Sequence, residues 1–174
     1  MYYNDINVTI QEAFEPSVGL INRAFLVTHE ATIPFTKLSG ANAIAELEAL
    51  LETLAVNGNL VVGGLTTPLP ISLEELNTIC PLLKQAIISL TSQTDSSGNP
   101  LFPDYIYVVG AYIENYQTAT DVSALTALIT ANTTVESDFW GIIPVKYNTD
   151  LVEWLVTFCA SKQKAFFVDI ESKT

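Results

Sequence analysis

The sequence predicts an α/β fold, a mostly parallel sheet with helices on both faces, preceded by an extended N-terminal strand or arm. Three apolar segments rich in β-forming residues lie at 105–111, 140–145 and 165–170, and a segment of helical apolar spacing separates each from the next. Strands that alternate with helices in this way form parallel sheets through right-handed crossovers. We therefore expect residues 1–20 to form the arm and residues 21–174 to form a single α/β domain.

The first third of the chain predicts two strands and a helix. Residues 6–11 alternate apolar and polar side chains, with the period of a half-buried strand. Residues 23–28 form a second β-rich segment. Residues 39–55 carry apolar side chains at helical spacing, with Ser39 as the expected N-cap and Asn57 and Gly58 as the stop.

The middle of the chain predicts a short strand, a helix and a loop. The strand covers residues 60–63, and Ser72 to Glu75 matches a capping box that starts the helix. Pro81 falls inside this helical pattern, so the helix is either kinked there or divided in two. Residues 94–103 are rich in Ser, Asn, Gly and Pro, which predicts a loop.

The two helices of the last third have recognisable starts. Asp121 is the expected cap of the first, and Asn148 opens the second. Asp150 in the first turn and Lys162 near the end of that second helix both favour its dipole.

Composition excludes several classes of function. The chain has 174 residues with 7 basic and 19 acidic side chains, a net charge of −12. Nucleic-acid binders need clustered Lys and Arg, and anionic membranes attract the same residues, so we expect neither as a partner. No apolar run reaches the roughly 20 residues of a membrane span, and the N-terminus lacks the pattern of a signal peptide.

The chain is unusually apolar for its size. Hydrophobic residues make up 49% and charged residues 15%, and the mean hydropathy is +0.33. Either the α/β core is large, or other subunits cover the outer faces. Cys80 and Cys159 are isolated and predict buried, reduced thiols of an intracellular protein.

Candidate catalytic groups are few, and each has a simpler structural explanation. His29 and Glu30 could act as a base and its orienting group, or His29 could be a surface residue at a strand end. Gly63-Gly64 is either a phosphate loop or a turn that needs glycine. The isolated cysteines have no basic neighbour that would activate them.

Acidic and aromatic residues at predicted strand ends leave similar alternatives. Asp104, Asp169 and Glu171 are either magnesium ligands or solvated charges. Residues 138–141, Asp-Phe-Trp-Gly, form either a stacking platform or an anchor of the core. We therefore expect no enzyme activity, no catalytic residue, no metal and no cofactor.

Two segments resemble the contractile-tail sheath-like proteins of tailed bacteriophages and prophages. The first combines Ile6-Asn7-Val8-Thr9-Ile10, Pro16-Ser17-Val18-Gly19 and the strand around Phe25-Leu26-Val27. The second runs from Thr120 through Ser137-Asp138-Phe139-Trp140-Gly141-Ile142-Ile143 to Ala165-Phe166-Phe167-Val168-Asp169. The resemblance covers most of the chain in order, although each motif is short and hydrophobic.

This resemblance implies a structural, self-assembling protein of the virion, made in the bacterial host cytoplasm. Its partners would be further copies of itself, in rings or a helical sheath, and the tail tube protein. Extended arms of such subunits add strands to the sheets of neighbours, so Ile6, Val8 and Ile10 are the expected subunit-interface residues. Sheath-like proteins are usually longer, so this chain would be either the N-terminal part of one or a shortened relative.

Two alternatives remain open at this point. One is a small α/β ligand-binding domain or enzyme with its site at the C-terminal strand ends, near Tyr112, Lys146 and Asp169. The other is a tail-associated adaptor that binds a partner without polymerising.

Overall fold

A computed structural model describes residues 23–63, 65–66, 78–118, 121–136 and 138–168 and contains a five-stranded sheet. The strand order is β2-β5-β1-β6-β7. β5 and β6 both pair parallel with β1, β7 pairs parallel with β6, and β2 pairs antiparallel with β5. The predicted mostly parallel α/β fold is therefore confirmed. The strands are β1 (Arg23–Thr28), β2 (Ile33–Ser39), β5 (Tyr105–Gly110), β6 (Gly141–Pro144) and β7 (Ala165–Phe166).

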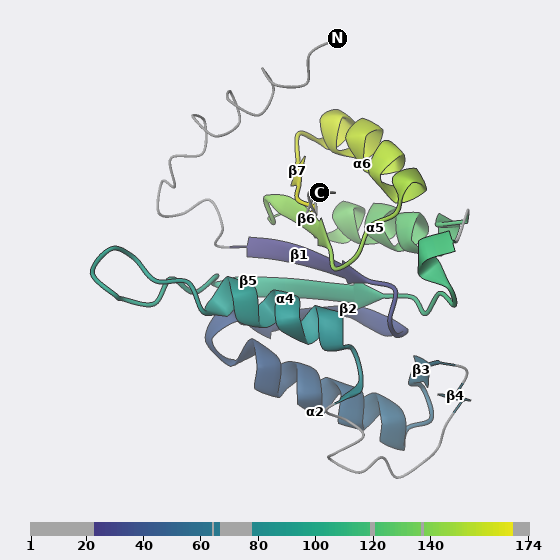
Figure 1. Cartoon of the computed structure of the whole chain (residues 1–174), viewed down its shortest axis with the longest axis horizontal. Coiled ribbons are helices and arrows are strands. Elements are labelled where there is room, and N and C mark those ends of the chain that lie inside the picture. The colour runs from purple at the N-terminus through teal and green to yellow at the C-terminus, as the bar shows by residue number, and fades with distance from the viewer. Residues whose placement is uncertain (1–22, 64, 67–77, 119–120, 137, 169–174) are drawn as a thin grey trace, which may run out of the picture.

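Two helices cover each face of the sheet (Figure 1). The helices α2 (Ala43–Val56) and α4 (Pro81–Thr91) pack on one face. The helices α5 (Ser123–Val135) and α6 (Thr149–Lys162) pack on the other. The short elements are the 3-10 turns η1 (Gly40–Asn42) and η2 (Tyr116–Thr118) and the small hairpin of β3 (Val61–Val62) and β4 (Leu65–Thr66).

Alternation along the central strand divides the core into two layers. Leu26 of β1 packs with α2 and α4, whereas Phe25 and Val27 pack with α5 and α6. The neighbouring strand β5 does the same, with Ile106 on the first face and Tyr107 on the second. A strand buried on both faces reads as a continuous apolar run, which is the pattern that predicted β1 and β5.

The connections place a topological switch point beside β1. The chain reaches β5 on one side of β1, and α5 then carries it back across β1 to β6 on the other side. In open α/β sheets, ligands bind outside the carboxyl ends of the strands at such a point.

The predicted elements of the first half are confirmed in part. The strand at 23–28 is β1, but the edge strand β2 at 33–39 was not predicted. The helix expected at 39–55 begins at Ala43, after η1, and Ser39 does not cap it with its side chain. Instead, the Ser39 backbone N–H donates to Glu46 Oε2 at 2.8 Å. The predicted strand at 6–11 lies outside the described residues.

Pro81 divides the predicted helix in two. Thr78 is helical, Ile79 and Cys80 form a bend, and α4 begins at Pro81. Proline suits the first helical position because its missing N–H would have no partner there. Cys80 precedes it in the left-handed conformation, with φ 54°. The capping box expected at 72–75 lies outside the described residues.

The second half follows the prediction closely. The expected loop at 94–103 is irregular, and the strands β5 and β6 form. The expected cap Asp121 is not the N-cap of α5, because Val122 holds that position, but the Asp121 carboxylate accepts from the Ser123 N–H at 2.8 Å. Asn148 Oδ1 accepts from the Leu151 N–H at 2.9 Å and caps α6. β7 covers only Ala165–Phe166 of the expected 165–170, and residues beyond 168 lie outside the described part of the chain.

Gly110 allows the β1–β2 turn to pack against the end of β5. A Cβ on Gly110 would overlap the carbonyl oxygen of Ala31 and the side chain of Thr28. The Ala111 N–H also donates to the Thr28 carbonyl at 3.1 Å. The carboxyl end of β5 is therefore fixed tightly against the turn that follows β1.

Candidate functional site

A polar pocket of about 280 Å³ lies at the carboxyl ends of the central strands. Its three principal side chains come from segments that follow β1, β5 and β6: His29, Tyr116 and Lys146. Asn115, Gln117 and Thr118 complete the lining. These segments are far apart in the sequence. They meet because β1, β5 and β6 are parallel neighbours whose carboxyl ends lie at the same end of the sheet.

Backbone and side-chain hydrogen bonds hold the walls of this pocket. The Ile113 N–H donates to the His29 carbonyl at 3.0 Å and fixes the segment after β5 against the end of β1. Asn148 Nδ2 donates to the Tyr116 carbonyl at 3.3 Å, which ties η2 to the start of α6. The His29 and Tyr116 rings stack, with centroids 4.2 Å apart and planes 20° apart.

Burial keeps the pocket imidazole neutral at pH 7. Desolvation, assisted by the charge of nearby Lys146, lowers the pKa of His29 to about 4. Burial also raises the pKa of Tyr116 to about 12, against a smaller opposing effect of the Asn148 backbone. His29 Nδ1 is buried and has no hydrogen-bond partner among the described residues. Lys146 is therefore the charged group of the pocket lining.

Of the two interpretations of His29, the one in which Glu30 orients its ring is wrong. Consecutive residues at a strand end point to opposite faces, and Glu30 turns toward α4. Its Oε1 accepts from the Leu82 N–H at 3.0 Å and its Oε2 from the Leu83 N–H at 2.9 Å. Glu30 therefore occupies the N-terminus of α4 with its own carboxylate, at a position where other folds bind anions.

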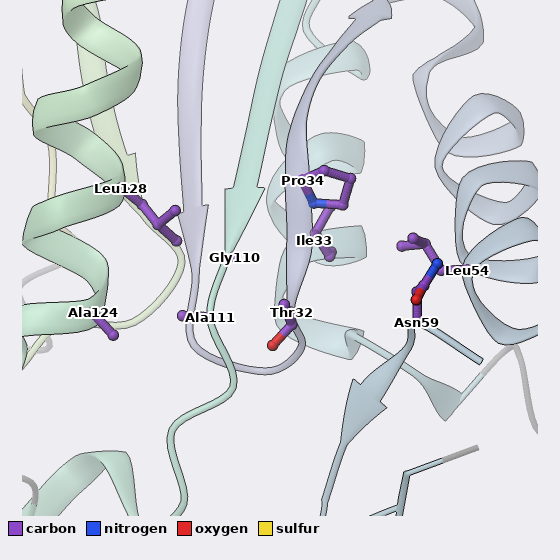
Figure 2. Close-up of a pocket in the computed structure, with 9 residues that line it drawn as sticks. All are labelled: Thr32, Ile33, Pro34, Leu54, Asn59, Gly110, Ala111, Ala124 and Leu128. Atoms are coloured by element: carbon purple, nitrogen blue, oxygen red, sulfur yellow. The ribbon is translucent and has the colours of Figure 1, made fainter. Parts of the chain in front are cut away.

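A larger, shallow hollow of about 560 Å³ surrounds the start of the edge strand β2 (Figure 2). Leu54 of α2 and Leu128 of α5 line it from opposite faces of the sheet, with Pro34 of β2 between them. Its polar side chains are those of Thr32 and Asn59. None of the described residues that line it has a titratable side chain.

Near the amino-terminal ends of the central strands, Asp138 joins β1 and β5 through its carboxylate. Asp138 Oδ2 accepts from Arg23 Nη1 at 2.9 Å, and Oδ1 accepts from the Tyr107 hydroxyl at 2.7 Å. Burial alone would raise the pKa of Asp138, but these hydrogen bonds and the charges of Arg23 and Lys37 outweigh it and lower that pKa. The arrangement is a structural clamp between β1, β5 and the segment before β6.

The Asp-Phe-Trp-Gly segment therefore anchors the core, as one of the two interpretations predicted. The Phe139 ring is buried, and its centroid lies 4.8 Å from the centroid of the Phe25 ring. Lys164 Nζ donates to the Phe139 carbonyl at 2.6 Å. Trp140 is the exception, because 56% of its surface is exposed.

The two edges of the sheet differ in how they would meet another strand. β2 has Pro34, a register shift between Ile33 and Thr36, and Lys37, whose Nζ lies 3.6 Å from the Tyr105 ring centroid. Proline, irregularity and lysine on an edge all discourage pairing with a further strand.

β7 forms the other edge. Its bonds to β6 come from the N–H groups of Ala165 and Phe167, to the carbonyls of Trp140 and Ile142. Alternate residues of a strand direct their backbone groups to opposite sides, so those of Phe166 face away from β6. Phe167, 41% exposed, lies against Gly141 of β6. Within the described residues this edge is open and has one exposed aromatic ring, Phe167, while Trp140 is exposed just before β6.

The other candidate residues do not assemble into a site. Cys80 and Cys159 are buried as predicted, and desolvation raises their pKa to about 12 and about 11. Gly63 occupies the β3–β4 turn with φ 50°, and Asp104 is exposed. Tyr112 does not line the pocket that contains Lys146. The remaining candidates lie outside the described residues: Ile6, Val8, Ile10, Gly64, Asp169 and Glu171.

In the described parts of the chain, no three His, Cys, Asp or Glu side chains gather as they would around a metal ion. The described helices are too short or too polar to cross a membrane.

Comparison with known proteins adds no relative. No protein-family model, curated protein or solved structure matches this chain. The resemblance to sheath-like proteins therefore stays a prediction that depends on the residues quoted for it.

Proposed function

We propose that this protein is a structural, self-assembling subunit of a phage or prophage tail sheath that packs around a tail tube. The tail context comes from the sequence resemblance. The observation that carries the self-assembly is the edge of β7, which is open among the described residues and where the Phe166 backbone faces away from the sheet next to the exposed ring of Phe167.

The assembly contact is strand addition. A neighbouring subunit contributes residues 5–12, whose backbone pairs with the Phe166 side of β7. Ile6, Val8 and Ile10 occupy alternate positions, so their side chains lie on one face of the added strand. That face covers Phe167, and the main-chain hydrogen bonds supply affinity. The protected β2 edge makes the contact directional, which favours rings or a helical array over random aggregation.

A proline substitution isolates the backbone contact. Phe166→Pro removes the outward N–H without breaking a bond to β6, because Ala165 and Phe167 donate those bonds. Phe166→Ala loses the same half-buried ring but keeps the N–H, so it is the matched control. In multi-angle light scattering, we expect the parent protein and Phe166→Ala to form large species and Phe166→Pro to form none.

Deleting residues 1–12 tests the donor side of the same contact. The shortened protein should be monomeric and should keep the circular dichroism spectrum of the parent. Unchanged assembly of Phe166→Pro, or of the deletion variant, would contradict strand addition at β7.

A further inference from the structure

We propose that the pocket of His29, Tyr116 and Lys146 binds a small anionic molecule, recognised through a phosphate or carboxylate group. This inference is independent of the assembly proposal. The pocket lies outside the carboxyl ends of β1, β5 and β6, next to the switch point between β1 and β6. Chain crossovers in opposite directions leave a crevice there, which is the usual ligand position of open α/β sheets.

The charge of the lining selects an anion. Lys146 is half-buried, and no carboxylate of the described residues forms a salt bridge with it. The other lining side chains are neutral: an imidazole, a phenol, two amides and a hydroxyl. In a chain of net charge −12, this lysine thus lies in a hollow of the surface with no carboxylate among the described residues paired to it. A ligand carboxylate or phosphate would form a charge-assisted hydrogen bond with Lys146 Nζ.

The pocket also contains an unsatisfied hydrogen-bonding group. His29 Nδ1 is buried without a partner, and leaving such an atom unpaired costs stability. The stacked Tyr116 ring holds the imidazole against one wall. A neutral imidazole has one donor and one acceptor nitrogen, so it suits a ligand with a polar group next to its anionic group.

A second anion position near this end of the sheet, at the start of α4, is occupied. The Glu30 carboxylate already accepts the Leu82 and Leu83 N–H groups at the start of α4. A ligand phosphate would have to displace this built-in anion. The Lys146 pocket is therefore the one of the two that remains free to bind a ligand.

The volume limits the size of the ligand. About 280 Å³ is at the small end of ligand pockets, which usually measure about 300–1,000 Å³. This suits a short phosphate ester or a dicarboxylate and is too small for a dinucleotide. Glycerol 3-phosphate, malonate and inorganic phosphate are accordingly the probes.

Two lysine variants test the proposal by isothermal titration calorimetry. Lys146→Gln and Lys162→Gln each remove one positive charge, but Lys162 is exposed near the end of α6, away from the pocket lining. We expect saturable binding of at least one probe to the parent protein. Lys146→Gln should weaken this binding about tenfold or more, and Lys162→Gln should change it less than twofold.

His29→Gln supplies a second variant, which removes the stacked imidazole and should also weaken binding while the circular dichroism spectrum is retained. Preference for glycerol 3-phosphate or for malonate then identifies the anionic group. Absence of saturable binding at millimolar concentrations of all three probes would overturn the proposal. Equal weakening by Lys146→Gln and Lys162→Gln would also overturn the proposal, because it would show that the anion is attracted by the general charge of the protein and not by this pocket.

Discussion

Replacing Glu30 by Gln tests the way the first helix layer is attached to the sheet. The Glu30 carboxylate accepts three hydrogen bonds, two from the first N–H groups of α4 and one from Thr28 Oγ1 at 3.2 Å. Glutamine keeps the length of the side chain and one acceptor oxygen, but its amide nitrogen cannot accept. One α4 N–H therefore loses its partner, and the negative charge at the positive end of the helix dipole is lost.

The magnitude follows from these two losses. An unpaired, partly buried N–H costs about 1–3 kcal/mol, and the charge–dipole interaction contributes about 0.3–1 kcal/mol. We expect Glu30→Gln to lower the free energy of unfolding by about 2–3 kcal/mol, with an unchanged urea m value. Glu52→Gln, on the exposed side of α2, is the matched control. Surface changes of this kind stay within about 0.5 kcal/mol. Equal urea midpoints for the two variants would refute the role assigned to Glu30.

Three further predictions concern stability. His29 is the single histidine, and folding lowers its pKa from 6.5 to about 4. Between these pH values the unfolded chain binds one more proton than the folded protein, so the free energy of unfolding should drop as the pH falls from 6.5 to about 4. His29→Gln should flatten this part of the plot of unfolding free energy against pH. Asp138→Asn should destabilise the protein by about 1–2 kcal/mol at pH 7. Folding lowers the Asp138 pKa below 3.8, so the Asp138 carboxylate stabilises the protein above that pH and loses this effect as the pH falls further. The unfolding free energies of parent and variant should therefore converge in acid. Gly110→Ala should lower the free energy of unfolding, measured by heat or urea, by about 1–3 kcal/mol, because the added Cβ meets the backbone of Ala31. A loss within experimental error would show that the turn between β1 and β2 can move away from β5.

The sequence predicted the fold class because its buried strands and helix caps have local signatures. β1 and β5 are continuous apolar runs, and Asn148 is a cap whose side chain bonds the backbone three residues later. β2 was missed because Pro34 and the register shift before Thr36 break the alternation that identifies a strand. That irregularity is the same feature that protects β2 as an edge.

The candidate pocket was predictable only in outline. Lys146 was one of three residues expected near a strand-end site, because it follows a strand predicted from local pattern. Tyr116 belongs to a short 3-10 turn with no distinctive spacing, and its contact with His29 depends on the order of the strands in the sheet. The opposite directions of His29 and Glu30 likewise depend on which helix covers each face.

Electron microscopy of the negatively stained protein tests self-assembly most directly. The parent chain and its Phe166→Pro variant would be imaged side by side. We expect stacked rings or tubes from the parent and none from the proline variant. Monodisperse small particles from the parent would contradict a sheath-like function.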